Sequence, residues 1–217
     1  MRESASDIRR YLQAHGTVRL SAVLIVLAMC NAAFGWIHIA LPSAQAPGGM
    51  VSVPFRKEVP VIFASLAVGS LASHMDSFER SASAALGRAR WIHPGAAILA
   101  VTLLVAVSEL LASSPGQAAV FIRAVLLWAG MALVSGSLLE WKLAWVLPVA
   151  SIFPVVYYGR GPSGEVRWWD WTSLPASDPV CWGLAALSLA VGFSLIAASP
   201  WRLRRAKRAA RLLGLRP

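Results

Sequence analysis

The sequence predicts an all-α, polytopic membrane protein, on the basis of six long apolar runs, Lys and Arg gathered at alternate gaps, and few charges. Hydrophobic residues make up 57% of the 217 residues and charged residues only 14%, which is far from the balance of a soluble domain. About 20 helical residues cross a hydrocarbon core about 30 Å thick. Most of the runs approach that length, and the predicted spans are residues 17–41, 59–75, 91–112, 118–139, 143–158 and 180–199.

The distribution of Lys and Arg predicts the orientation. These residues cluster before the first run, in the second and fourth gaps, and after the last run. The other gaps contain only Arg56, Lys57, Arg160 and Arg167. Because basic loops stay in the cytoplasm, we expect a multi-pass protein of the plasma membrane with both ends cytoplasmic. Much of the net charge of +10 lies beside the membrane ends, so the expected partner is anionic lipid and not nucleic acid.

We expect three parts in the chain. Residues 1–16 form an amphipathic interfacial helix, residues 17–200 the six-helix transmembrane domain, and residues 201–217 a basic cytoplasmic tail. The N-terminal helix is predicted from a stripe at helical spacing, which consists of Ile8, Tyr11, Leu12 and His15. Such a stripe beside arginines is typical of a helix that lies on the membrane surface.

The two long outer loops differ in composition. The loop 42–58 is rich in Pro and Gly, which predicts an irregular connection. The loop 159–179 contains Trp168, Trp169 and Trp171. Tryptophan prefers the membrane interface, so we expect these three rings to be interfacial anchors. The alternative is a lid or an aromatic surface for an amphipathic cargo.

Polar residues at membrane depth are the candidate functional residues. Glu109 and Arg123 lie at similar depth on either side of a predicted turn, so we expect them to form an ion pair, either structural or part of a substrate or proton site. Asn31 and His38 are seven residues apart on the first predicted helix and therefore share a face. They are candidates to line a path or to form hydrogen bonds between helices.

The chain contains no enzyme signature. We find no nucleophile elbow, no Gly-rich phosphate loop and no metal-ligand spacing. Cys30 and Cys181 lie at different depths, so no disulfide is expected, and two isolated cysteines do not make a metal site. We therefore expect no catalytic residue, no metal and no directly bound cofactor. An intramembrane enzyme would need polar groups that converge at one depth, and only Glu109 and Arg123 come close.

The cytoplasmic loop after the second run predicts a short capped helix over residues 76–86. Asp76 and Glu79 have the spacing of a capping box, and Gly87 suits the position after the helix. Phe78 and Leu86 fall on one stripe beside charged residues. Such a helix either lies on lipid or docks into another protein.

The stretch Ser73-His74-Met75-Asp76-Ser77-Phe78-Glu79-Arg80, followed by Trp91-Ile92-His93-Pro94, resembles small actinobacterial permease-like proteins of the ABC exporter group. The Trp-rich loop and basic tail within 167–208 are also similar. The resemblance implies a permease subunit that pairs with a second copy or a homologue and uses ATP only through a separate cytoplasmic ATPase. It also implies a re-entrant outer element between the last two spans. The implied residues for ATPase coupling are Asp76, Phe78, Glu79 and Arg80.

A second class of function fits the same composition. A membrane module that does not transport, such as an immunity, scaffold or assembly subunit of a larger complex, would also be apolar, basic at its ends and free of catalytic motifs.

Overall fold

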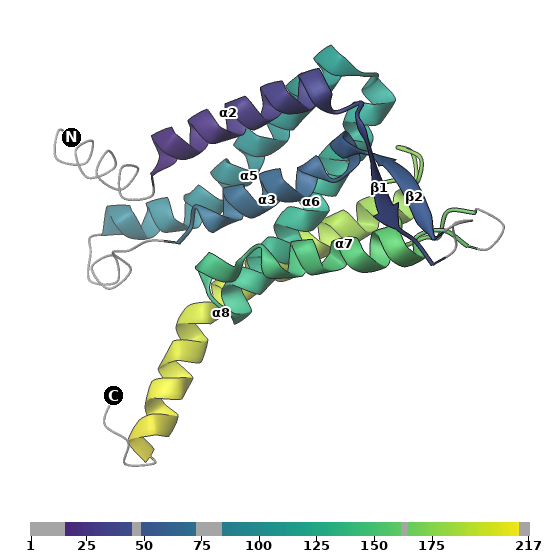
Figure 1. Cartoon of the computed structure of the whole chain (residues 1–217). Helices are drawn as coiled ribbons and strands as arrows, with labels where there is room; N and C mark the ends of the chain where they lie inside the picture. The colour runs from purple at the N-terminus through teal and green to yellow at the C-terminus, as the bar shows by residue number, and fades with distance from the viewer. Residues whose placement is uncertain (1–15, 45–48, 73–83, 162–164, 213–217) are drawn as a thin grey trace.

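The computed structural model describes residues 16–44, 49–72, 84–161 and 165–212. Within these ranges the chain is mostly helical, as the sequence predicts (Figure 1). The elements in chain order are α2 (Thr17–Phe34), β1 (His38–Pro42), β2 (Met50–Pro54), the 3-10 turn η1 (Phe55–Lys57), α3 (Val59–Gly69), α5 (Ala84–Ala112), α6 (Pro115–Leu138), the 3-10 turn η2 (Trp141–Leu143), α7 (Val146–Tyr158) and α8 (Pro179–Leu212). Apart from Gly16, the amphipathic helix expected over residues 1–16 lies outside the described residues.

Five helical segments of the described chain are long and apolar enough to cross a membrane. They are Thr17–Phe34, Trp91–Ala112, Pro115–Leu138, Trp141–Tyr158 and Pro179–Ala198. This finding is consistent with a multi-pass membrane protein. The second predicted span, 59–75, is described as far as residue 72, and within this described part it is helical over the 11 residues of α3, about 16 Å at 1.5 Å per residue. The six-span topology and its orientation therefore stay predictions.

The first helix is shorter than predicted. The run 17–41 was expected to be one helix, but α2 ends at Phe34 and the chain continues into an antiparallel hairpin in which His38 pairs with Pro54. The chain leaves the helix at Gly35, whose carbonyl oxygen accepts a hydrogen bond from the Arg56 backbone N–H at 3.1 Å. A Cβ at Gly35 would come within 2.4 Å of the Asn31 carbonyl oxygen, so glycine suits this position. The hairpin also shows that the loop 42–58 is not wholly irregular, since β2 and η1 lie within it.

Two further helix boundaries differ from the predictions. Gly87 does not end a helix, because α5 begins at Ala84 and continues through it. Helix α8 does not end near residue 200 but extends to Leu212, so the first part of the predicted basic tail continues the last span. Its C-terminal part projects away from the other helices (Figure 1). Gly87 therefore lies inside α5 and Pro200 inside α8. Both residue types are tolerated inside helices at a cost in stability.

Helix α6 is the centre of the bundle. Of its span 67% is buried, against 17–22% for the other four candidate spans, and it packs against α3, α5, α7 and α8. Trp128 and Leu133 on α6 are fully buried. Close approach to α8 depends on Gly130, where a Cβ would come within 2.4 Å of the Ser188 carbonyl carbon. Small residues permit this kind of contact between membrane helices.

Candidate functional site

Buried polar side chains gather at one end of the bundle, which we call the hairpin end. Helices α2, α5 and α7 end there, α6 and α8 begin there, and the β-hairpin lies beside them (Figure 1). The segment 165–178, between α7 and α8, also lies at this end, and we call it the cap segment. The opposite end, where α2 begins, α3 ends and α7 begins, is called the open end.

Glu109 joins three elements at the hairpin end. Its side chain is 1% exposed, in the last turn of α5. The Asn31 amide of α2 donates to Oε1 at 2.6 Å, and the Ser113 hydroxyl donates to Oε2 at 3.0 Å. The Arg56 guanidinium of η1 lies 3.9 Å from Oε2. A charge-assisted hydrogen bond and a nearby cation reduce the cost of a buried carboxylate, so Glu109 holds α2, α5 and η1 together.

Arg123 holds the cap segment. Its side chain is fully buried on α6. One guanidinium nitrogen donates to the Pro175 carbonyl oxygen at 2.7 Å. The other donates to the carbonyl oxygens of Trp171 at 2.6 Å and of Leu174 at 2.9 Å. The planar guanidinium offers several donors at fixed angles, so one side chain satisfies three backbone carbonyls of an irregular segment.

The expected ion pair between Glu109 and Arg123 does not form. Glu109 points to α2 and η1, whereas Arg123 points to the cap segment. The prediction compared the depths of the two residues along their helices, and depth does not fix the direction in which each side chain leaves its helix. The hydrogen-bond partners of Arg123 are backbone groups of an irregular segment, which no residue type in the sequence identifies.

Asn31 and His38 do not share a helical face. Asn31 is buried and contacts Glu109, which agrees with the expected bond between helices. His38 is exposed and opens strand β1. The helical spacing rule does not apply across the end of α2, so the shared-face prediction is wrong for this pair.

A second polar contact ties the cap segment to η1. The Lys57 ammonium lies 3.3 Å from the Asp170 carboxylate and donates to the Ser173 hydroxyl at 2.5 Å. Asp170 is 2% exposed and also accepts hydrogen bonds from the Thr172 hydroxyl and the Ser173 backbone. The carboxylate therefore orders its own loop while it binds Lys57 from a segment more than a hundred residues earlier.

Glu58, next to Lys57, is a buried carboxylate of a different kind. Its two carboxylate oxygens are inaccessible to solvent and accept no hydrogen bond from the described residues. Burial raises the pKa of this carboxyl from 4.5 to about 7; Lys57 lowers it and Asp170 raises it. Burial disfavours the charged form of any group that lacks a partner, so Glu58 titrates near neutral pH.

The three loop tryptophans have different environments. Trp168 is 60% exposed and packs edge-on to Trp169, whose ring faces the Arg167 guanidinium at 5.0 Å. The exposed Trp168 and the half-buried Trp169 suit the predicted interfacial position. Trp171 does not, because it is buried and packs edge-on to Trp128 of α6 with ring centroids 6.1 Å apart. It is part of the core.

Sequence reasoning treated Arg56 and Lys57 only as a charge count and missed Glu58 and Asp170. The available signal was the run Arg56-Lys57-Glu58 in a gap otherwise poor in basic residues.

Among the residues that the structure describes, no three His, Cys, Asp or Glu side chains are grouped to hold a metal ion. The coupling candidates Asp76, Phe78, Glu79 and Arg80 lie outside the described residues. The arrangement at the hairpin end is therefore a set of contacts that fixes the cap segment on the bundle.

Comparisons of the chain with family models, with curated proteins and with solved structures found no match.

Proposed function

We propose that the chain is the membrane-spanning permease subunit of an ATP-driven exporter, with a separate cytoplasmic ATPase and a second permease copy or homologue. The cap segment is the observation that carries this proposal. It lies between α7 and α8, where the resemblance to ABC exporter permeases implies a re-entrant element. Trp171 is buried, and Arg123, to which the segment binds, is eight residues and about 12 Å along α6 from Pro115.

The contacts of the bundle suggest how movement would be transmitted. Central α6 packs against four other helices, so a tilt of one helix pair changes the packing of the others. In the proposed mechanism, the open end faces the cytoplasm, ATPase closure displaces the 76–86 segment, and the bundle moves between two packed arrangements. The hairpin end then faces outward in the plasma membrane, and its polar contacts keep the cap segment in place.

A second subunit is part of this proposal because three buried charged groups, unlike Glu58, already have partners within the chain. Glu109, Arg123 and Asp170 have partners within the chain. A path for cargo would therefore be formed where two copies meet. Large apolar side chains are exposed on several helices, such as Leu103 and Leu111 of α5 and Val23 of α2, and such surfaces suit lipid or another apolar subunit.

The proposal is tested by co-expression with the ABC ATPase encoded nearest to this chain. We expect the ATPase to co-purify and the double substitution Glu79→Lys with Arg80→Glu to weaken that association about tenfold or more, since charge contacts set the register of a docking helix. The matched control is Glu140→Lys with Lys142→Glu, a charge swap at two exposed residues between α6 and α7. The control is expected to retain the ATPase.

Thermal unfolding of each variant separates loss of docking from loss of folding. A folded Glu79/Arg80 variant that keeps the ATPase, or a wild-type chain that never binds one, would overturn the exporter proposal. The non-transporting immunity, scaffold or assembly function would then be favoured.

A further inference from the structure

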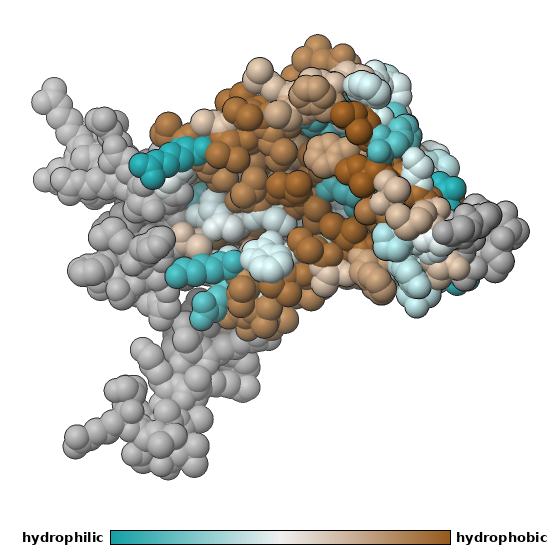
Figure 2. Space-filling model, viewed as in Figure 1, coloured by the Kyte–Doolittle hydropathy of each residue, from teal (hydrophilic) through white to brown (hydrophobic). Residues whose placement is uncertain are grey.

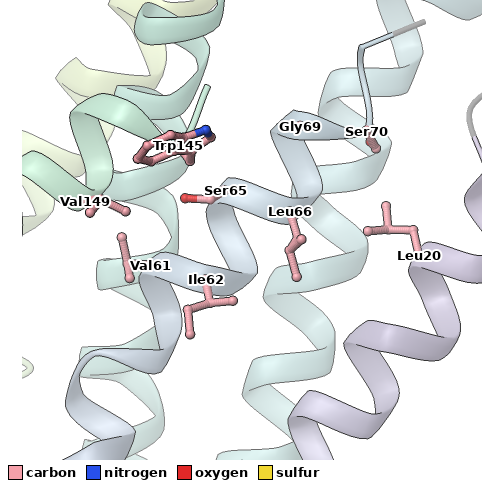
Figure 3. A pocket seen from close by; sticks show the side chains of 9 residues that line it. All are labelled: Leu20, Val61, Ile62, Ser65, Leu66, Gly69, Ser70, Trp145 and Val149. Carbon is pink, nitrogen blue, oxygen red and sulfur yellow. The ribbon is translucent and has the colours of Figure 1, made fainter. Parts of the chain in front are cut away.

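An apolar groove of about 550 Å³ follows the surface of α3 at the open end. Leu20 of α2 forms one wall, Ile62 and Leu66 of α3 the floor, and Trp145 and Val149 the other wall (Figure 3). Gly69, the last residue of α3, also lines the groove, and a Cβ at this position would meet nothing within 4 Å. The short helix and its terminal glycine leave the space that longer side chains would fill.

The groove opens sideways between helices that can cross a membrane. Ile62, Trp145 and Val149 are each between 39% and 49% exposed, so the walls contact whatever surrounds the bundle. In a bilayer that surrounding medium is lipid. A groove with mostly apolar walls does not hold water well, and its volume falls within the range of about 300–1,000 Å³ typical of ligand sites. An acyl chain is the occupant that suits this environment.

Charged residues flank the groove at the open end. Arg19 precedes Leu20 in the first turn of α2, and Lys142 lies in η2, three residues before Trp145. Both are exposed, and the Glu140 carboxylate of the same turn is exposed too, which leaves one net positive charge from these three residues. Figure 2 shows hydrophilic groups on both sides of the groove at this end, with paler residues between apolar ridges. An apolar trough with a cationic mouth complements an anionic amphiphile.

We propose that this groove binds an anionic phospholipid of the surrounding membrane leaflet, with one acyl chain against α3 and the phosphate beside Arg19 and Lys142. The bound chain fills the space between α2 and α7 and joins two helices that border opposite sides of α3. This site requires no ATPase, so it stands apart from the exporter proposal. Lipid that binds only the folded chain stabilises it, and this stabilisation rises with the logarithm of the lipid concentration once that concentration exceeds the Kd.

The test uses the full chain, purified and delipidated in a neutral detergent and titrated with phosphatidylglycerol or with phosphatidylcholine of the same acyl chains. Native mass spectrometry counts the lipids bound per chain, and thermal unfolding reports the stabilisation. We expect one phosphatidylglycerol to bind about tenfold or more tightly than phosphatidylcholine. Gly69→Leu is expected to weaken phosphatidylglycerol binding about tenfold, because its side chain occupies the place of several methylene groups.

Two further variants make the result specific. Arg19→Gln with Lys142→Gln is expected to abolish the preference for phosphatidylglycerol and to leave weak binding of both lipids. Gly95→Leu is the matched control, because Gly95 also has open space around its Cβ position but lies on α5 and does not line the groove. It is expected to bind lipid as the wild type does.

Three outcomes would overturn the proposal. Equal affinity for the two lipids would remove the role of the cationic mouth. Equal loss in Gly69→Leu and Gly95→Leu would show a general effect of added bulk. Unchanged lipid binding in Gly69→Leu together with loss of a dimer mass would assign the groove to a second copy of the chain.

Discussion

The two ends of the bundle differ in whether their charged side chains are buried or exposed. At the hairpin end, charged side chains are largely withdrawn from solvent and bind partners far apart in sequence, as Glu109 does with Asn31 and Lys57 with Asp170. At the open end, Arg19, Glu140 and Lys142 are exposed, and an apolar groove lies beside them. Buried charges that lose a partner are costly, so the hairpin end is expected to be rigid. At the open end, the exposed charged side chains and the apolar groove are accessible to a ligand or partner.

The largest expected effect is the loss of Arg123. Arg123→Gln removes the guanidinium that serves the carbonyl oxygens of Trp171, Leu174 and Pro175. Each hydrogen bond to a charged group contributes roughly 1.5–3 kcal/mol, and the shorter, neutral glutamine amide has only two N–H donors for the three carbonyl oxygens. We expect the free energy of unfolding in mixed detergent micelles to fall by about 3–5 kcal/mol.

Arg160 provides the control for this substitution. It is exposed near the end of α7, so Arg160→Gln is expected to change the free energy of unfolding by no more than about 0.5 kcal/mol. Equal effects at the two positions would mean that the carbonyl contacts of Arg123 do not stabilise the cap segment.

Glu109 gives the next largest effect. Glu109→Leu leaves the Asn31 amide and the Arg56 guanidinium without their acceptor and is expected to cost about 2–4 kcal/mol. Glu109→Gln keeps an oxygen for the Asn31 amide and should cost about 1 kcal/mol. The free energies of unfolding of both variants, measured under one condition, check the ranking. A larger loss in the glutamine variant would contradict the assigned hydrogen bond.

The sequence predicted the helices better than it predicted their contacts. Long apolar runs identify spans because the whole run must avoid water, and the run 118–139 matches α6 within a few residues. The end of α2 was missed because hydrophobicity alone cannot distinguish an apolar helix from an apolar hairpin strand. Ile37 and Ile39 continue the apolar run, while the backbone hydrogen bonds with β2 and η1 take the chain out of the helix.

The candidate site was predicted only in part, for a physical reason. Glu109 and Arg123 were recognisable because charge at membrane depth is rare. Their partners were not, since Arg123 binds backbone carbonyls and Lys57 binds a residue 113 positions later. Such contacts depend on how helices rotate about their axes and on the path of an irregular segment. Neither leaves a periodic pattern in the sequence.

Glu58, at the hairpin end, is expected to make the free energy of unfolding depend on pH. Burial raises its pKa in the folded chain to about 7 from 4.5, so the folded state binds the proton more tightly than the unfolded state. The contribution of the protonated Glu58 carboxyl to the free energy of unfolding is full below about pH 4.5 and is lost as the pH rises through 7. Glu58→Gln is expected to raise the free energy of unfolding by up to about 3 kcal/mol at about pH 8 and hardly at all at about pH 4.5.

The same titration in Glu140→Gln is the control, because Glu140 is exposed at the open end. The free energy of unfolding of Glu140→Gln, measured across this pH range, should change with pH at the same slope as that of the wild type. A Glu58→Gln variant that also kept the wild-type slope would show that another group is responsible.

A smaller effect is expected where the cap segment meets η1. Lys57→Met removes the contacts with Asp170 and Ser173 but leaves those of Arg123 in place. Because the Lys57 side chain is 15% exposed, the loss is expected to be about 1–2 kcal/mol. Hydrogen exchange should accelerate in the cap segment and not in α6. Uniform acceleration over the whole bundle would contradict a local role.

The smallest effect is expected at the open end. Gly69→Leu adds a side chain where a Cβ meets nothing within 4 Å, so the free energy of unfolding of the lipid-free chain should change by no more than about 0.5 kcal/mol. Gly130→Leu is the informative contrast, because the same addition would force α6 away from the α8 backbone near Ser188. Overpacking of that kind costs about 1–3 kcal/mol or more. If both glycine variants lost equal stability, the open end would be as tightly packed as the core, and the contrast between the two ends would fail.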